Sequence, residues 1–196
     1  MPSDEKSGKH RQHPVFDASR AEHLDTRLRR FIYRPARLAN RYVKPGDRVL
    51  DFGCGPGFFT REFAKVVGDS GRVIAVDLQE EMLRIVRGKM QADGLLPRIT
   101  LHQCKPDSIN LPEDQNETFD AAFTIFVVHE VPDPEKLFRE ISTLLKPGGI
   151  LFFSEPPFIV SGREFADEIA LAEDAGFRHE KDSWFFVNRA AVLRKS

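Results

Sequence analysis

A glycine-rich loop in the first third of the chain carries the clearest chemical signal. Gly53, Gly55 and Gly57 alternate with other residues directly after the apolar run 48–52. Glycines between a strand and a helix let the backbone pass close to a ligand and point its amide N–H groups at it. A dinucleotide-binding loop would read G-x-G-x-x-G, but the sixth position counted from Gly53 or from Gly55 is not glycine. The loop therefore predicts a ligand that is not held by a pyrophosphate, which disfavours a nicotinamide oxidoreductase.

Two carboxylates near this loop indicate the charge of that ligand. Asp51 lies just before the loop, where it would repel a pyrophosphate and attract an amino or sulfonium group. Asp77 ends the next apolar run, 24 residues after Gly53, where a carboxylate can accept hydrogen bonds from both hydroxyls of a ribose. Either aspartate alone is more often a solvated carboxylate at a strand end. Together with the loop, the pair predicts a site for a nucleoside that carries positive charge.

These residues need a framework that brings strand ends together. Apolar runs predict strands at 48–52, 72–76, 99–104, 119–127 and 150–154. Amphipathic runs between and after them predict helices at 58–67, 80–93, 133–145 and 163–175, with a turn at 146–149. Alternating strands and helices imply a parallel sheet covered on both faces. Two last segments, 177–181 and 184–194, have only the short connection 181–183 and should pair as an antiparallel hairpin.

The stretch 49–60 resembles the glycine loop of class I S-adenosylmethionine-dependent methyltransferases, of the small-molecule type. The run Val73 to Asp77 and the later Leu145-Lys146-Pro147-Gly148-Gly149 add motifs in the same order as in that family. The resemblance extends from about Asp47 to the end of the chain. It implies an α/β fold, namely a Rossmann-like three-layer sandwich around a seven-stranded, mostly parallel sheet with a C-terminal antiparallel hairpin. It also implies S-adenosyl-L-methionine as cofactor and S-adenosyl-L-homocysteine as product.

The resemblance further implies which residues hold the methionine end of the cofactor. Gly53, Gly55 and Gly57 would line the methionine part. Asp51 would hold its amino group directly or through water, and Phe126 would border the methyl group.

The nucleoside end of the cofactor receives its own set of residues by the same resemblance. Asp77 would bind the ribose, with Leu78 and Met82 packed on the adenine. Asp107, followed by Ser108, stands at the family's acidic-small pair and would accept a hydrogen bond from the adenine amino group.

The sequence says less about the methyl acceptor. Methyl transfer is an in-line displacement for which a protein must align and desolvate its two reactants, and a base is needed only if the acceptor loses a proton. His129 follows the fourth predicted strand and suits a general base, while a structural histidine at a turn is an equal alternative. We interpret Glu130 as a capping or solvated carboxylate. We interpret the run 154–158 as a chain-turning element, because the similar motif of amino methyltransferases follows the fourth strand instead.

The first 43 residues are predicted to be a basic tail and helical cap on a methyltransferase domain at 44–196. Residues 1–48 hold 12 Lys+Arg and 6 Asp+Glu, a net of +6, which leaves −7 for residues 49–196. Apolar residues recur at helical spacing from 19 to 42, with a break near Pro35. This cap would close the pocket, with substrate contacts from the side chains of Phe31, Tyr33, Arg30 and Arg34. The alternative is a basic helix on the sheet edge with its arginines in solvent.

Composition limits the remaining function classes. The chain has 196 residues and a formal net charge of −1, which fits one globular domain and excludes nucleic-acid binding by bulk charge. No apolar run approaches the ~20 residues that span a bilayer. The two cysteines, Cys54 and Cys104, form neither a disulfide framework nor a metal cluster, so we expect a reducing cytoplasm and no metal.

We therefore predict methyl transfer to a small-molecule acceptor in a desolvated pocket at the C-terminal ends of the strands. Quinone- and sterol-type C-methyltransferases are the nearest analogy for the acceptor, at the level of fold only. One alternative is an RNA or protein methyltransferase that uses the basic front, although few aromatic residues interleave with its charges. Another is a catalytically silent cofactor-binding scaffold. Nucleic acid is not an expected partner, and a homodimer is compatible with the sequence.

Overall fold

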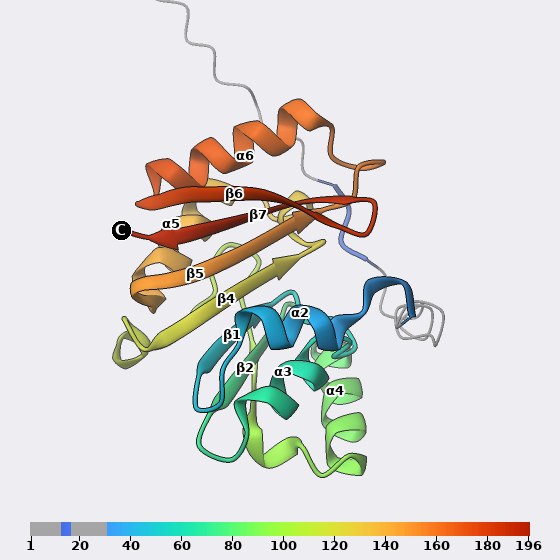
Figure 1. Ribbon diagram of the computed structural model, residues 1–196. Helices are drawn as coiled ribbons and strands as arrows, with labels where there is room; N and C mark the ends of the chain where they lie inside the picture. The colour runs from blue at the N-terminus through green and yellow to red at the C-terminus, as the bar shows by residue number, and fades with distance from the viewer. Residues whose placement is uncertain (1–12, 17–30) are drawn as a thin grey trace, which may run out of the picture.

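Seven strands form one sheet in the computed structural model, which describes residues 13–16 and 31–196 (Figure 1). They are β1 (Arg48–Phe52), β2 (Arg72–Asp77), β3 (Ile99–Gln103), β4 (Phe119–Ile125), β5 (Leu145–Glu155), β6 (Phe177–Phe185) and β7 (Asn188–Lys195). Their order across the sheet is β3-β2-β1-β4-β5-β7-β6. Strands β1 to β5 pair in parallel, and β7 runs antiparallel to both β5 and β6. The predicted mostly parallel sheet with a terminal hairpin is confirmed.

The sheet has a hydrophobic core on each face, because successive side chains of a strand point to opposite faces. The helices are α2 (Pro35–Tyr42), α3 (Thr60–Val67), α4 (Glu80–Ala92), α5 (Pro134–Leu144) and α6 (Gly162–Asp174). Short 3-10 turns lie at η2 (Leu96–Arg98), η3 (Glu113–Gln115) and η4 (Val128–Glu130). Val49 and Phe123 pack with α2, α3 and α4, whereas Leu50 and Phe153 pack with α5 and α6. Figure 1 shows these two groups of helices around the sheet, and the three-layer prediction is confirmed.

Side-chain caps fix where the helices of the second group begin. Asp133 accepts a hydrogen bond from the Lys136 amide at 2.9 Å, and Pro134 occupies the first helical position of α5. Ser161 and Glu164 form a reciprocal capping box at the start of α6. A cap of this kind contributes about 1 kcal/mol. The start of α5 is therefore well defined, directly after the loop that carries the candidate base.

The hairpin turn lies elsewhere than predicted. Residues 181–183 belong to β6 and pair with Val192, Ala191 and Ala190 of β7. The chain reverses instead at Phe186 and Val187, between the paired residues Phe185 and Asn188. Residues 181–183 are polar, which favours a turn, but β6 is an edge strand, where polar side chains are readily accommodated.

The predicted turn at 146–149 is also wrong. This stretch lies inside β5, where the register shifts from the pair Phe119–Leu145 to the pair Ala121–Ile150. The Pro-Gly-Gly sequence therefore forms an irregularity within β5, opposite Asp120, rather than a turn before the strand.

The front of the chain shows the break that the sequence predicts. Residues 31–33 are helical, Arg34 adopts φ 43° and ψ 57°, and α2 begins at Pro35. A residue before proline is disfavoured in the right-handed helical region, which accounts for the interruption. The rest of the predicted cap helix lies outside the described residues. Within residues 13–16 and 31–196, no helix is long and apolar enough to cross a membrane.

Candidate functional site

A cavity of about 390 Å³ opens where the parallel strands end. The loops that follow β1, β2, β3 and β4 line it, together with Val15, Phe16 and Tyr33 from the front of the chain. The strand order reverses between β1 and β4, and such a switch point is where open α/β sheets bind ligands. The volume lies within the range of about 300–1,000 Å³ that small-ligand sites occupy.

The glycine loop lies against the loop that follows β4. Gly53 has φ 71°, and a Cβ there would be 2.4 Å from Cγ2 of Val127, so only glycine fits this contact. Gly55 lines the cavity, and no atom lies within 4 Å of the position that its Cβ would take. The backbone at Gly55 is therefore open to a ligand. A Cβ on Gly57 would instead meet Met90 at 3.0 Å, and Gly57 does not line the cavity.

Asp77 lines the cavity and also fixes the loop. Its Oδ2 accepts a hydrogen bond from the Gly55 amide at 2.8 Å, and its Oδ1 accepts one from the Gln79 amide at 2.9 Å. Burial raises the pKa of Asp77, although both hydrogen bonds oppose this shift. The carboxylate thus has a set orientation at the end of β2, with lone pairs left for a ligand.

Asp51 is buried near the end of β1, just before the loop, and does not line the cavity. Its Oδ2 accepts a hydrogen bond from the hydroxyl of Thr60 at 2.5 Å. Burial raises the pKa of Asp51 to about 7, with a smaller contribution from the charge of Asp77, while the Thr60 hydroxyl opposes the shift. We predicted that Asp51 holds the amino group of the cofactor either directly or through water, and this buried position suits the contact through water.

The remaining predicted cofactor residues all line the cavity: Leu78, Met82, Asp107, Ser108 and Phe126. Asp107 is 72% exposed, and its carboxylate lies 3.5 Å from Nζ of Lys136. Phe126 has φ 63°, a left-handed conformation that is uncommon outside glycine. Its ring lies edge-to-face with that of Tyr33, at 5.6 Å between centroids.

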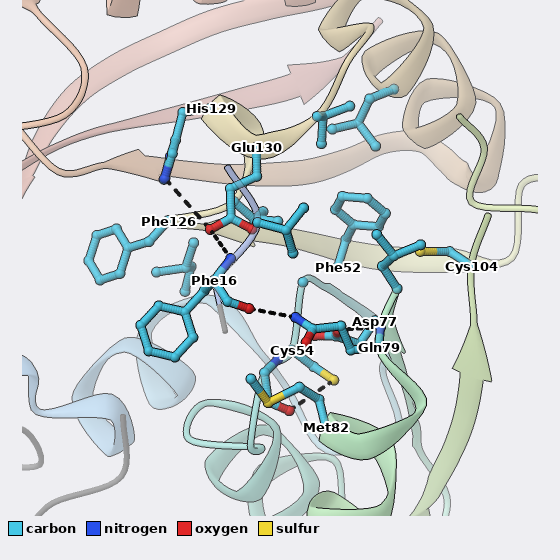
Figure 2. Close-up of a pocket in the computed structure, with 18 of the residues that line it drawn as sticks. Phe16, Phe52, Cys54, Asp77, Gln79, Met82, Cys104, Phe126, His129 and Glu130 are labelled. Carbon is cyan, nitrogen blue, oxygen red and sulfur yellow. Dashed lines mark hydrogen bonds and ion pairs between the residues drawn. The ribbon is translucent and has the colours of Figure 1, made fainter. Parts of the chain in front are cut away.

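His129 lies at the cavity on η4, buried between two carboxylates. Its Nδ1 contacts Oε2 of Glu155, and its Nε2 lies 3.9 Å from Oε1 of Glu130, the contact drawn in Figure 2. Glu155 is buried, and its Oε1 accepts a hydrogen bond from the Val128 amide at 2.8 Å. Burial lowers the pKa of His129, but the hydrogen bond and charge of Glu155, helped by Glu130, outweigh it and raise the pKa above its ordinary value.

Neither Glu155 nor Glu130 was predicted as a partner of His129. Glu155 stands in the run that we interpreted as a chain-turning element, yet its carboxylate orients His129. Glu130, interpreted as a capping or solvated carboxylate, lines the cavity and is largely buried. The one signal for Glu155 was its place at the end of β5, beside the strand that leads to His129.

Residues 13–16 join the loops on either side of the cavity. The His13 amide donates to the carbonyl of His129 at 2.8 Å, and the Phe16 amide donates to Oε1 of Glu130 at 3.2 Å. The side chain of Gln79 donates to the carbonyl of Phe16 at 2.7 Å (Figure 2). This short strap therefore links the loop after β2 to the loop after β4.

The predicted substrate residues have different outcomes. Tyr33 lines the cavity, but Phe31 is 73% exposed and does not line it. Arg34 lines a second, neighbouring cavity, and Arg30 lies outside the described residues. Across the described chain, no group of three His, Cys, Asp or Glu residues could hold a metal ion.

The sequence profile of the family described as methyltransferase domain matches residues 49–149, more than half of the chain. The chain belongs to this methyltransferase family. The matched region contains the glycine loop, Asp77 and His129, whereas Glu155, Tyr33 and residues 13–16 lie outside it. The family is that of the class I S-adenosylmethionine-dependent methyltransferases, as the resemblance implied.

Relatives and a solved structure agree with this placement. The methyltransferase is 36% identical over 117 residues to the ubiquinone/menaquinone biosynthesis C-methyltransferases of Vibrio campbellii and Teredinibacter turnerae. Each alignment covers 58% of this chain, and they cover 44% and 46% of those relatives, so the match spans less than half of their length. The crystal structure of a SAM-dependent methyltransferase from Aquifex aeolicus superposes with a TM-score of 0.80 at 28% identity, covering 92% of this chain and 98% of that one.

Proposed function

We propose that this methyltransferase methylates a small, largely apolar acceptor that loses a proton to His129. The observation that carries the proposal is the buried His129–Glu155 pair at the rim of a cavity lined mainly by apolar side chains. A structural histidine would not need to face a ligand cavity, whereas a general base must.

The lining divides into a cofactor side and an acceptor side. Asp77 would accept from the ribose hydroxyls, and Leu78 and Met82 would cover the adenine. The exposed backbone at Gly55 would contact the methionine part, and Asp51 would compensate the charge of the amino group through water. When bound, S-adenosylmethionine supplies an electrophilic methyl group. The residues that remain for the acceptor are those around His129.

Apolar side chains keep water from this acceptor side. Phe126, Tyr33 and Phe16 line the cavity near the strap, and Ile125 and Val127 flank Phe126. A dry cavity strengthens the electrostatic interactions within it and leaves an acceptor without competing water.

The His129–Glu155 pair would take up the acceptor's proton. With the carboxylate of Glu155 at Nδ1, the neutral ring carries its proton on Nδ1 and leaves Nε2 as the acceptor atom. When Nε2 takes a second proton, Glu155 compensates the new charge in a place where an unpaired charge would be costly. The pair therefore suits an acceptor such as a ring hydroxyl, or a ring carbon next to one. The named activity of the C-methyltransferase relatives is consistent with the second of these.

A transfer experiment with labelled S-adenosylmethionine tests this proposal. The enzyme is incubated with separate small-molecule, RNA and protein fractions, and the label is counted in each after extraction. We expect the label in the fraction extracted into organic solvent. Label that disappears after RNase or protease treatment would instead support the macromolecular alternatives. Absence of label from every fraction, despite cofactor binding, would support the silent scaffold.

A further inference from the structure

A second cavity of about 260 Å³ lies beside the first, between α2 and the β6–β7 hairpin. Tyr33 lines both cavities and so forms part of the wall between them. Its ring centroid lies 5.6 Å from that of Phe126 on the first side, and 5.4 Å and 5.8 Å from those of Phe185 and Phe186 on the second. The two cavities are therefore neighbours separated by aromatic rings.

Three arginines line the second cavity from one face of α2 and its start. Arg34, Arg37 and Arg41 are spaced three and four residues apart, which places them on the same side of a helix. No carboxylate lines this cavity, and none of the three forms an ion pair among the residues that the structure describes. Like charges at this spacing repel one another, so the cluster favours a bound anion.

Tyr42 and Ser183 add polar residues to the lining of this cavity. The hydroxyl oxygen of Tyr42 is buried and has no hydrogen-bond partner within the described structure, although such atoms are normally paired. Nζ of Lys181, on β6, lies 5.9 Å from the centroid of the Tyr42 ring, and Cζ of Arg41 lies 5.4 Å from it. Ser183 of β6 also lines the cavity. Arginines of α2 and Ser183 of β6 thus line the cavity from opposite sides, and Lys181 lies close to Tyr42.

The backbone on each side of the cavity adopts an uncommon conformation. Arg34 has φ 43° and Phe186 has φ 62°, both left-handed although neither is glycine. Such conformations persist where the surrounding structure holds them, and they gather at ligand sites.

We propose that this second cavity binds a phosphate group carried by a soluble small molecule. Several guanidinium groups offer the paired N–H donors that match phosphate oxygens. Because their positive charges add up, they suit a ligand with two negative charges better than a ligand with a single carboxylate. The Tyr42 hydroxyl gains its missing partner in the same complex. This assignment concerns α2 and β6 alone and does not depend on the identity of the methyl acceptor.

Calorimetry with inorganic phosphate and with diphosphate tests the site directly, at an ionic strength near 0.15 M. Arg37→Gln should weaken binding by roughly 10-fold, since a hydrogen bond to a charged group is involved, and Arg37→Gln with Arg41→Gln should abolish it. Tyr42→Phe should weaken it by a few-fold. Arg87→Gln is the matched control, because Arg87 is an exposed helical arginine of α4 outside both cavities, and binding should be unchanged.

The outcomes separate this proposal from its competitors. Equal affinity for phosphate in the wild type and in the double variant would overturn it. A loss of affinity in Arg87→Gln as large as that in Arg37→Gln would overturn it as well. Binding to phosphatidic-acid vesicles without binding to soluble phosphate would overturn it as well and would indicate a membrane-facing surface. S-adenosylmethionine titrated into the same variants reports the first cavity. Phosphate binding without cofactor binding would contradict the proposed function and leave the second site intact.

Discussion

Nδ1 of His129 contacts the carboxylate of Glu155, and both side chains are buried at the edge of the first cavity. The contact follows from the parallel pairing of β4 and β5, in which Ile125 lies beside Ser154. The chain after β4 turns through η4 and returns His129 to the end of β5. Because Glu155 also accepts a hydrogen bond from the Val128 amide, one carboxylate fixes both the ring of His129 and the backbone just before it.

Replacing Glu155 with glutamine removes the charge while keeping the shape of the side chain. The amide cannot compensate an imidazolium, so we expect the pKa of His129 to fall and the turnover number to drop by about 10²-fold or more. Cofactor affinity should be unchanged. NMR titration of the His129 ring measures the pKa directly, and kinetics with any acceptor identified by label transfer measure turnover.

A merely structural role of Glu155 would give a different result. Turnover would then fall only in proportion to lost folded protein, and the His129 pKa would stay raised. Arg163→Gln, a change at an exposed position of α6, controls for general effects of charge.

Cofactor binding should release protons from Asp51. In the free protein its pKa is about 7, so the side chain is roughly half protonated at pH 7. A cationic amino group nearby favours the carboxylate, and binding should release about half a proton per cofactor at this pH. Calorimetry in buffers with different ionisation enthalpies counts these protons. Equal binding enthalpies in all buffers would remove Asp51 from the interaction.

The same residue should make stability depend on pH. Its folded-state pKa of about 7 lies above the unfolded value of about 3.9, so the folded protein binds more protons than the unfolded chain between these values. The free energy of unfolding should therefore decline as the pH rises from about 4 to 7. Asp51→Asn should reduce this slope in urea titrations, whereas a similar slope in both proteins would assign the dependence to other groups.

Two glycines of the loop offer a matched test of packing. Gly53→Ala places a Cβ 2.4 Å from Val127 in a left-handed conformation, whereas Gly55→Ala has the left-handed strain but meets no atom within 4 Å. We expect Gly53→Ala to cost about 1–3 kcal/mol more, because overpacking adds to the backbone strain. Urea denaturation measures both. In a double-mutant cycle, Val127→Ala should offset part of the stability lost in Gly53→Ala and show no coupling with Gly55→Ala. Equal costs for the two glycine variants would contradict the packing of Gly53 against Val127.

Local signals were sufficient to predict most of the fold. The strands from β1 to β4 are short apolar runs bounded by turn residues, and their predicted bounds agree with the structure to within two residues. The hairpin turn was missed because it holds Phe186 in a left-handed conformation with no glycine to mark it.

The sequence predicts those parts of the site whose residues lie in one short stretch or at a fixed spacing. The glycine loop and Asp77 were visible because fixed spacing links them. The role of Glu155 was not visible, because it contacts a residue 26 positions away in the sequence. The strap was not visible either, because it binds through the backbone amides of His13 and Phe16. Backbone hydrogen bonds leave no side-chain pattern, so sequence alone could not reveal the strap.

The central claim is that the cavity binds S-adenosylmethionine with Asp77 on the ribose. Calorimetry of the wild type and Asp77→Ala with S-adenosylmethionine, S-adenosylhomocysteine and NAD tests it most directly. The wild type should bind the first two and not NAD, and Asp77→Ala should weaken both by about 10-fold or more, because a charge-assisted hydrogen bond is lost. Binding of NAD alone, or unchanged affinity in a folded Asp77→Ala protein, would contradict the account.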